Sequence, residues 1–436
     1  MSQLSIPRVH GISARGALAG SAAVAVAGVV AYEPRLGALA AALSLWAIVV
    51  AVITARVRVH DGAHVVSLIH NAAIAKVVTS GLLLALLAVA YRGGDALHYH
   101  GSGTHIAAQI RAGLPVTTVY PAPGTGTVEL MTGWLYLAIA PVQYAGYLVY
   151  SCGGFVGGYC WYRAVRMMEP SVDPRRLALL LFFAPSFLVW TSPISKDAVI
   201  FLYFGVAAIG MAHLACGRLR GVAHVAAGLG LTATIRPHLS VMFAAALAVA
   251  LVAGRAPQRR VARPRLGARV LAGILAVAVG YLALQNLVAN SSIAQGKSVA
   301  EVSQTLADVG TASQTGGTAF EAEPVTSLGA LPQALLTVLY RPLLFEARSP
   351  LVLVCALESA LLLGGLVIVP ALGGALRWRA LLHPLGLFGL TLMIMFAVGF
   401  ANFGNFGYLV RQRTQLLPVL IAVPLMLRAA ASREEA

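Results

Sequence analysis

Charged residues are scarce in this sequence and so are the motifs of soluble enzymes. Only 11% of the 436 residues are charged, whereas a soluble domain carries about 25%. There is no Walker motif, no glycine-rich nucleotide fingerprint in a strand–helix context, no HExxH and no Ser-His-Asp pattern above chance. The four cysteines lie in or beside apolar segments, without metal-ligand spacing or a disulfide framework. These absences argue against soluble nucleotide chemistry and a structural metal centre.

Long apolar runs fill the space that the charges leave. Hydrophobic residues make up 59% of the chain, and runs close to 20 residues recur along its length, as in membrane helices. A β-barrel would instead show alternating segments of about ten residues. We therefore predict an all-α polytopic transmembrane bundle, a single membrane domain over residues 1–436. The twelve predicted spans are 17–32, 37–55, 71–90, 131–151 (or on to 162), 177–190, 198–215, 222–235, 239–254, 270–290, 351–372, 385–402 and 416–430.

The basic residues indicate how these spans are oriented. The net charge of +16 does not indicate nucleic acid, because the basic residues lie in short loops where positive charge sets membrane orientation. With both termini cytoplasmic and the first helix retained, twenty Lys and Arg residues fall inside and ten outside. The predicted location is the plasma membrane, which the chain crosses many times. Two larger segments, 92–130 and 291–350, are then extracytoplasmic loops. In the second loop we expect a lid, Ser291 to Thr318, followed by an interfacial helix, Leu335 to Arg348.

The first of these loops opens with the candidate catalytic residue. Asp95 follows two glycines where an apolar run ends, and His98 and Tyr99 stand beside it. A carboxylate at a helix mouth can act as a general base on a hydroxyl or bind a metal that carries a diphosphate. The alternative is a solvated turn residue with no chemical task. Glu129 is a candidate partner for Asp95 in space.

Basic residues at the predicted outer helix ends form a candidate substrate site. Arginine forks match phosphate oxygens, and Pro237 interrupts an apolar stretch at Arg236. A helix cap at Ser195 with Asp197 in the first turn is the structural alternative for this segment. A lysine that only snorkels to the interface is the alternative at Lys196, and a tight turn is the alternative at Arg236. The candidate substrate-binding residues are His98, Tyr99, Lys196, Arg236, His238, Arg341, Arg411 and Arg413.

Two further carboxylates belong with this set. Glu346 can pair with Arg341 close by in the sequence. Glu358 lies about two turns inside a predicted span, and an intramembrane carboxylate is either functional or hydrogen-bonded within the bundle. No metal-ligand set is assigned, and a divalent metal, though compatible with Asp95, is not required by the sequence.

The motif Gly94-Asp95-Ala96-x-x-Tyr99, following an early span, resembles the acidic first-loop motif of C-type polytopic glycosyltransferases. That resemblance implies a polyprenyl-phosphate sugar donor and an acidic base. Segments 185–197, 236–238 and 405–413 resemble uncharacterised actinobacterial membrane proteins of cell-surface polysaccharide biosynthesis. Two spans precede Asp95 here, whereas one is usual in the C-type enzymes, and Asp95 lacks the paired acid that many of them carry.

The sequence therefore favours an extracytoplasmic glycosyltransferase of cell-envelope polysaccharide assembly. Its expected partners are a polyprenyl-phosphate- or diphosphate-linked sugar donor, a glycan or lipid-linked acceptor, and membrane lipids. Asp95 would act as the base while the cations hold the phosphate. The alternatives are a polymerase that joins lipid-linked repeat units and a flippase or transporter of lipid-linked oligosaccharides.

Overall fold

The computed structural model is helical throughout the part that it describes. It describes residues 34–87, 89, 94–255, 318–322, 325, 327–372, 374 and 380–435. The α-helices are α2 (Pro34–His60), α3 (Ala63–Leu86), α4 (Asp95–Arg111), α5 (Thr125–Ala138), α6 (Gln143–Met168), α7 (Pro174–Phe182), α8 (Pro185–Trp190), α9 (Lys196–Ala215), α10 (Gly221–Ala233), α11 (Pro237–Ala253), α14 (Leu331–Tyr340), α15 (Pro350–Ala360), α16 (Val369–Leu372), α17 (Pro384–Phe400), α18 (Phe406–Arg413) and α19 (Leu417–Glu435). A π-helical stretch, Leu361–Ile368, joins α15 to α16. These described residues contain no named strand.

Five helical segments of the described chain are long and apolar enough to cross a membrane. They are Pro34–His60, Ala63–Leu86, Lys196–Ala215, Val352–Leu372 and Phe406–Ser432. The shorter apolar helices are Gly221–Ala233, Pro237–Ala253, Leu328–Tyr340 and Pro384–Phe400. Twelve spans are thus not confirmed, and the predicted spans 17–32 and 270–290 lie outside the described residues.

Two predicted spans are broken where prolines interrupt the helix. The segment 131–162 is divided between α5 and α6, which are separated at Pro141. The segment 177–190 forms the short helices α7 and α8, with Pro185 opening the second. Proline lacks the amide hydrogen that a continuous helix needs, and its ring clashes with the preceding turn. Apolar composition alone therefore overestimated the length of these helices.

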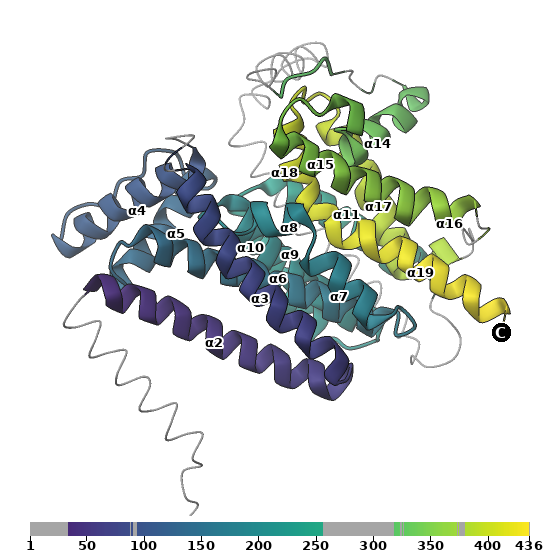
Figure 1. The fold of residues 1–436 in the computed structure, drawn as a ribbon, viewed down its shortest axis with the longest axis horizontal. Helices are drawn as coiled ribbons and strands as arrows, with labels where there is room; N and C mark the ends of the chain where they lie inside the picture. The colour runs from purple at the N-terminus through teal and green to yellow at the C-terminus, as the bar shows by residue number, and fades with distance from the viewer. Residues whose placement is uncertain are drawn as a thin grey trace, which may run out of the picture.

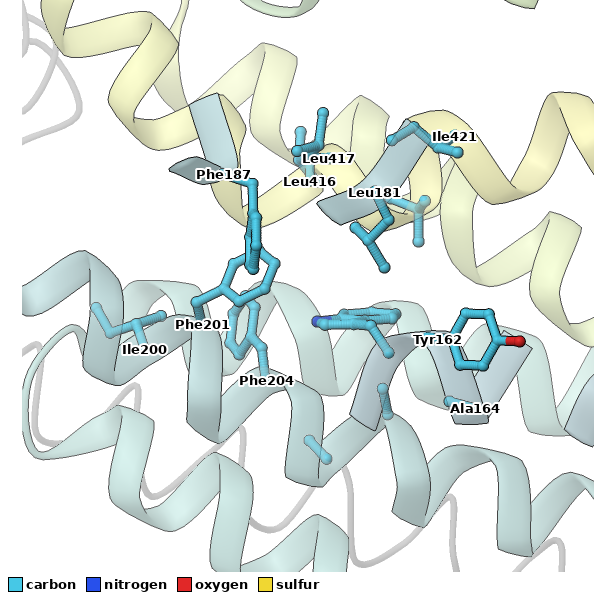
Figure 2. Close-up of a cluster of buried hydrophobic side chains, with 14 of the residues drawn as sticks. Tyr162, Ala164, Leu181, Phe187, Ile200, Phe201, Phe204, Leu416, Leu417 and Ile421 are labelled. Carbon is cyan, nitrogen blue, oxygen red and sulfur yellow. The ribbon is translucent and has the colours of Figure 1, made fainter. Parts of the chain in front are cut away.

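The helix α9 lies at the centre of the bundle between α6 and α10 (Figure 1). Glycines on α6 and α9 allow the two backbones to approach closely, since a Cβ atom on Gly157 would lie 2.6 Å from the carbonyl oxygen of Phe201. Aromatic rings then fill the space towards the later helices: Phe204 packs on Phe243 with 4.8 Å between ring centroids. Figure 2 shows this core continuing to Leu417 and Ile421 of the last helix, α19. Because α9 is held on all sides, its two ends are fixed.

The polar segment predicted as the first outer loop is largely helical. Gly94 has φ of +110°, a conformation that suits glycine, and α4 begins at the next residue, Asp95. α4 pairs closely with α5, because Gly103 faces Thr132 and Gly133 faces Ile106. Asp95 is therefore the first residue of a packed helix, where a carboxylate interacts favourably with the helix dipole.

The described part of the second loop is also packed. The predicted lid, Ser291 to Thr318, lies outside the described residues except for Thr318. The predicted interfacial helix, Leu335 to Arg348, ends at Tyr340 and packs through α14 against α17 and α18.

Candidate functional site

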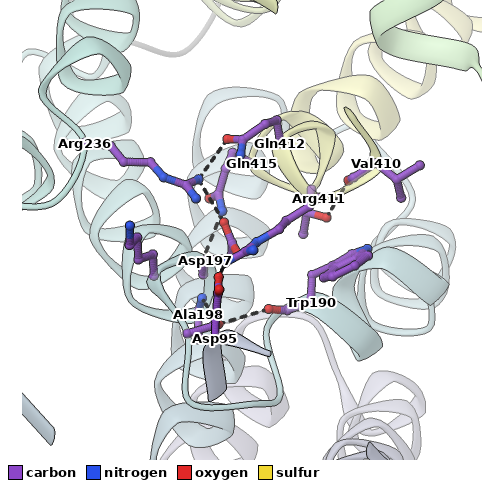
Figure 3. A network of polar contacts seen from close by, with 12 residues as sticks. Asp95, Trp190, Asp197, Ala198, Arg236, Val410, Arg411, Gln412 and Gln415 are labelled. Carbon is purple, nitrogen blue, oxygen red and sulfur yellow. Dashed lines mark hydrogen bonds and ion pairs between the residues drawn. The ribbon is translucent and has the colours of Figure 1, made fainter. Parts of the chain in front are cut away.

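Asp197 is the centre of a network of charged side chains (Figure 3). Ser195 caps α9 by accepting a hydrogen bond from the amide of Ala198 at 3.1 Å, so the structure contains the helix cap at this position. The Asp197 side chain is 1% exposed and accepts two guanidinium groups. Arg236 Nη1 lies 2.9 Å from Oδ1, and Arg411 Nε donates to Oδ2.

Asp95 joins the same network from its exposed side. Arg411 Nη2 lies 2.7 Å from Asp95 Oδ2, and the Asp95 side chain is 54% exposed. One guanidinium group thus bridges a buried carboxylate and an accessible one. The structure brings together Asp95, Arg236 and Arg411 from α4, the residue before α11, and α18.

Local sequence explains how these side chains arrive at one place. Arg236 stands just before Pro237, which opens α11, so it occupies the N-cap position of that helix. Arg411 lies on a short helix capped by the Asn405 side chain, which accepts from the amide of Tyr408 at 3.1 Å. Arg236 thus lies at the turn from α10 to α11, and Arg411 lies on the helix that follows the turn after α17. Charged side chains from distant segments meet close to these two turns.

Lys196 lies at the rim of the network. Its Nζ donates to Thr125 Oγ1 at 2.6 Å, which ties α9 to the start of α5. The site therefore contains three cations, Lys196, Arg236 and Arg411, and the two carboxylates described above. This leaves one excess positive charge beside an accessible carboxylate.

A cavity of about 260 Å³ opens at this network. Leu87, Trp190 and Ile194 form part of its wall, next to Asp95 and Arg411. It lies between the end of α3 and the start of α9, so apolar and charged groups face the same space. Such a lining suits a ligand with a charged head and an apolar tail.

Tyr99 and the adjacent histidines support the start of α4. Tyr99 is buried, and burial together with the Asp95 carboxylate raises the pKa of its hydroxyl, which therefore stays protonated at neutral pH. His98 Nε2 lies 2.7 Å from Glu129 Oε1, and the other Glu129 oxygen accepts from the amide of Val119 at 2.7 Å. Glu129 thus bonds to His98, and no contact with Asp95 is seen among the described residues.

His100 makes a separate contact on the same helix. Burial lowers its pKa, so the ring stays neutral near pH 7. His100 Nδ1 lies 2.8 Å from the hydroxyl oxygen of Tyr136. The pair fixes α4 on α5 and lies outside the charged network.

Arg413, which we grouped with the outer cations, points elsewhere. Its side chain is 1% exposed, and its Nη1 donates to the carbonyl of Leu339 at 2.9 Å and to Ser359 Oγ at 2.8 Å. Its Nη2 lies 3.6 Å from Glu358, which also accepts from the amide and hydroxyl of Ser186. The arginine, Glu358 and Ser186 form a buried cluster that joins α8, α15 and α18.

The remaining candidates also lie outside the network. Arg341 pairs with Glu346, as the sequence suggested, and its guanidinium stacks 4.2 Å from the ring centroid of Phe320. His238 contacts Phe400, with 6.0 Å between ring centroids.

Three members of the network were not identified from the sequence. Asp197 was interpreted as a favourable charge near a capped helix end, but it is the acceptor for both arginines. Gln412 accepts from Arg236 at 2.8 Å, and Gln415 donates to the Asp197 carbonyl at 3.2 Å. The available signal was an acidic residue two positions inside an apolar helix, together with glutamines next to Arg411.

In the part of the chain that the structure describes, no three His, Cys, Asp or Glu side chains gather where they could hold a metal ion.

Comparison of the chain with family models, curated proteins and solved structures gave no match. The geometry of this site is therefore the basis for assigning a function.

Proposed function

We propose that the chain is a membrane-embedded glycosyltransferase that takes a sugar from a polyprenyl phosphate or diphosphate carrier at the extracytoplasmic face. The observation that carries the proposal is the accessible Asp95 carboxylate, held by Arg411 beside two further cations. Displacing a phosphate from a sugar requires a base and a phosphate-binding group close together. Asp95 and Arg411 line the cavity, and Lys196 and Arg236 belong to the adjoining charged network.

In the proposed reaction, Asp95 accepts the proton of an acceptor hydroxyl. The hydroxyl oxygen forms a bond to the anomeric carbon as the bond between that carbon and the carrier phosphate oxygen breaks. The phosphate leaves with the electron pair, and its charge is stabilised by Lys196 and Arg236. Both cations retain donors for this role among the described residues, since the Lys196 ammonium donates one resolved hydrogen bond and Arg236 uses only Nη1.

Apolar residues in the cavity wall are the evidence for a donor with a lipid chain. Leu87, Trp190 and Ile194 lie beside the charged groups, and an isoprenoid chain would extend over such a surface. The position of Asp95 at a helix start also matters, because α4 is packed on α5 and fixes the carboxylate. Fixed geometry is what general-base catalysis needs.

The test is sugar transfer by the purified full chain in proteoliposomes that contain polyprenyl-phosphate-linked sugars. We expect Asp95→Asn to lower transfer by roughly 10²- to 10⁴-fold, the usual contribution of a general base, while the protein remains folded. Asp173→Asn is the matched control: Asp173 caps α7 through the amide of Arg176 at 2.8 Å, and asparagine caps equally well.

The outcome distinguishes the alternatives. Full transfer by Asp95→Asn would refute the assignment of the base. A ladder of product lengths would identify a polymerase of the same site chemistry. Movement of the lipid-linked sugar across the bilayer without transfer would show a transporter and overturn the proposal.

A further inference from the structure

A second cavity, of about 660 Å³, lies at the opposite end of α9 from Asp197. Its walls come from the C-terminal ends of α2, α6 and α9 and from the turn that leads into α10. α9 contains 20 residues, which corresponds to about 30 Å of helix. The second cavity is therefore separate from the site around Asp95 and faces the other end of the bundle.

The lining of this cavity is strongly basic. It contains Arg56, Arg163, Arg218 and Arg220, and no carboxylate. Arg163 is compensated by Asp61, at 3.5 Å between Nη1 and Oδ2. The other three arginines have no carboxylate partner among the residues that the structure describes. These three arginines are exposed, so water and salt screen part of the repulsion between their like charges. An anion between them would offset the remainder.

Histidines add a second observation that points to a ligand. His213 is 8% exposed and lines the cavity, and its Nδ1 is buried without a hydrogen-bond partner in the described structure. Its ring lies against that of His224, with 5.5 Å between centroids. His224 has a partner, since its Nδ1 lies 2.9 Å from the Arg220 carbonyl oxygen. A buried polar atom without a partner is costly unless a ligand or water satisfies it.

We propose that this cavity binds the phosphate group of a phosphorylated small molecule or of an anionic lipid. Arginine forks match the tetrahedral oxygens of phosphate and remain charged at any physiological pH. The volume lies within the roughly 300–1,000 Å³ of small-ligand sites, which is too small for a folded protein partner. The absence of carboxylates from the lining disfavours cationic ligands. The cavity is thus a second anion site, independent of the function proposed for Asp95.

The first experiment uses the full chain in nanodiscs of zwitterionic phosphatidylcholine, titrated with inorganic pyrophosphate by calorimetry at low salt. We expect the double variant Arg56→Gln/Arg220→Gln to weaken binding at this cavity by about tenfold or more, because each arginine supplies charge-assisted hydrogen bonds. Any binding near Asp95 remains as a separate component. Arg58→Gln is the control: Arg58 lies on α2 two residues after Arg56, is exposed and does not line the cavity.

The second experiment identifies the source of the phosphate. Nanodiscs with added phosphatidylglycerol are examined by native mass spectrometry. If a lipid headgroup is the ligand, the parent and Arg58→Gln retain phosphatidylglycerol and the double variant loses it. If a soluble phosphate is the ligand, only the pyrophosphate titration separates these proteins. His213→Phe keeps a ring of similar shape without nitrogen and provides a folded test if the double variant does not fold; weaker binding is expected.

The proposal is overturned if neither ligand distinguishes the double variant from the parent. It is also overturned if Arg58→Gln weakens binding as much as the double variant does. That result would indicate attraction to a diffuse positive surface and not to this cavity.

Discussion

Asp197 and Asp95 share one arginine but differ in burial, so the same substitution should reduce the stability of the protein by very different amounts at the two positions. We expect Asp197→Asn to destabilise the protein strongly and Asp95→Asn to leave its stability nearly unchanged. Asp197 is fully buried between two guanidinium groups, whereas the Asp95 side chain is 54% exposed. Asparagine has nearly the same shape as aspartate, so the comparison isolates the charge.

The expected magnitudes follow from what each substitution leaves behind. Removing one partner of a buried ion pair costs about 3–5 kcal/mol because the other charge remains buried. After Asp197→Asn, Arg411 retains Asp95 and Arg236 retains its hydrogen bond to Gln412, so the lower value, about 3 kcal/mol, is expected. An exposed pair contributes roughly 0–1 kcal/mol, which bounds the loss in Asp95→Asn. The two variants should differ by about 2 kcal/mol or more.

The assay is equilibrium unfolding in mixed micelles titrated with sodium dodecyl sulfate, followed by circular dichroism. The double variant completes a mutant cycle: Arg411 then loses both carboxylates, so the combined loss should exceed the sum of the single losses. An Asp197→Asn protein as stable as Asp95→Asn would refute the view that Asp197 holds the network together.

Two further predictions concern packing in the bundle. Gly157→Ala should cost about 1–3 kcal/mol of stability through overpacking between α6 and α9. Gly153→Ala should leave the stability unchanged, because its Cβ would lie 3.6 Å from the nearest side chain. The same unfolding titration compares the two variants. Lys76 is fully buried and donates to the Thr191 hydroxyl at 2.7 Å. Lys76→Ala should cost about 2–5 kcal/mol of stability by opening a cavity. Lys76→Met fills the same space and should leave the stability nearly unchanged. Equal losses of stability in both variants would contradict this expectation.

The sequence indicated most residues of the charged site but not which side chains they contact. Placing charges at helix ends identified Asp95, Lys196, Arg236 and Arg411, because an unneeded charge near hydrocarbon is costly. It also placed Arg413 in that group, but two residues along a helix correspond to a rotation of about 200°, and Arg413 faces the bundle interior. Which face a residue occupies depends on packing that the sequence pattern did not reveal.

The sequence could not identify Asp197 as the centre of the network for a related reason. A capped helix with an acidic first turn is stable by itself, so local rules gave a sufficient explanation for the carboxylate. Its second role depends on Arg236 and Arg411, which lie 39 and 214 positions away. Local and long-range roles coincide at this residue.

The breaks in two predicted spans leave the same helix ends grouped together, because each broken segment still runs between the same two ends of the bundle. The segment predicted as one span at 131–162 is two helices, yet it begins near Lys196 through Thr125 and ends where Arg166 bonds Asp61 at 3.0 Å. The short pair α7–α8 likewise runs from the neighbourhood of Arg166, whose Nη1 donates to the Val172 carbonyl, to Trp190 in the wall of the Asp95 cavity. Each broken segment still connects the same two ends as one continuous span would. The Asp95 cavity therefore lies at the start of α9 and the basic cavity along its second half.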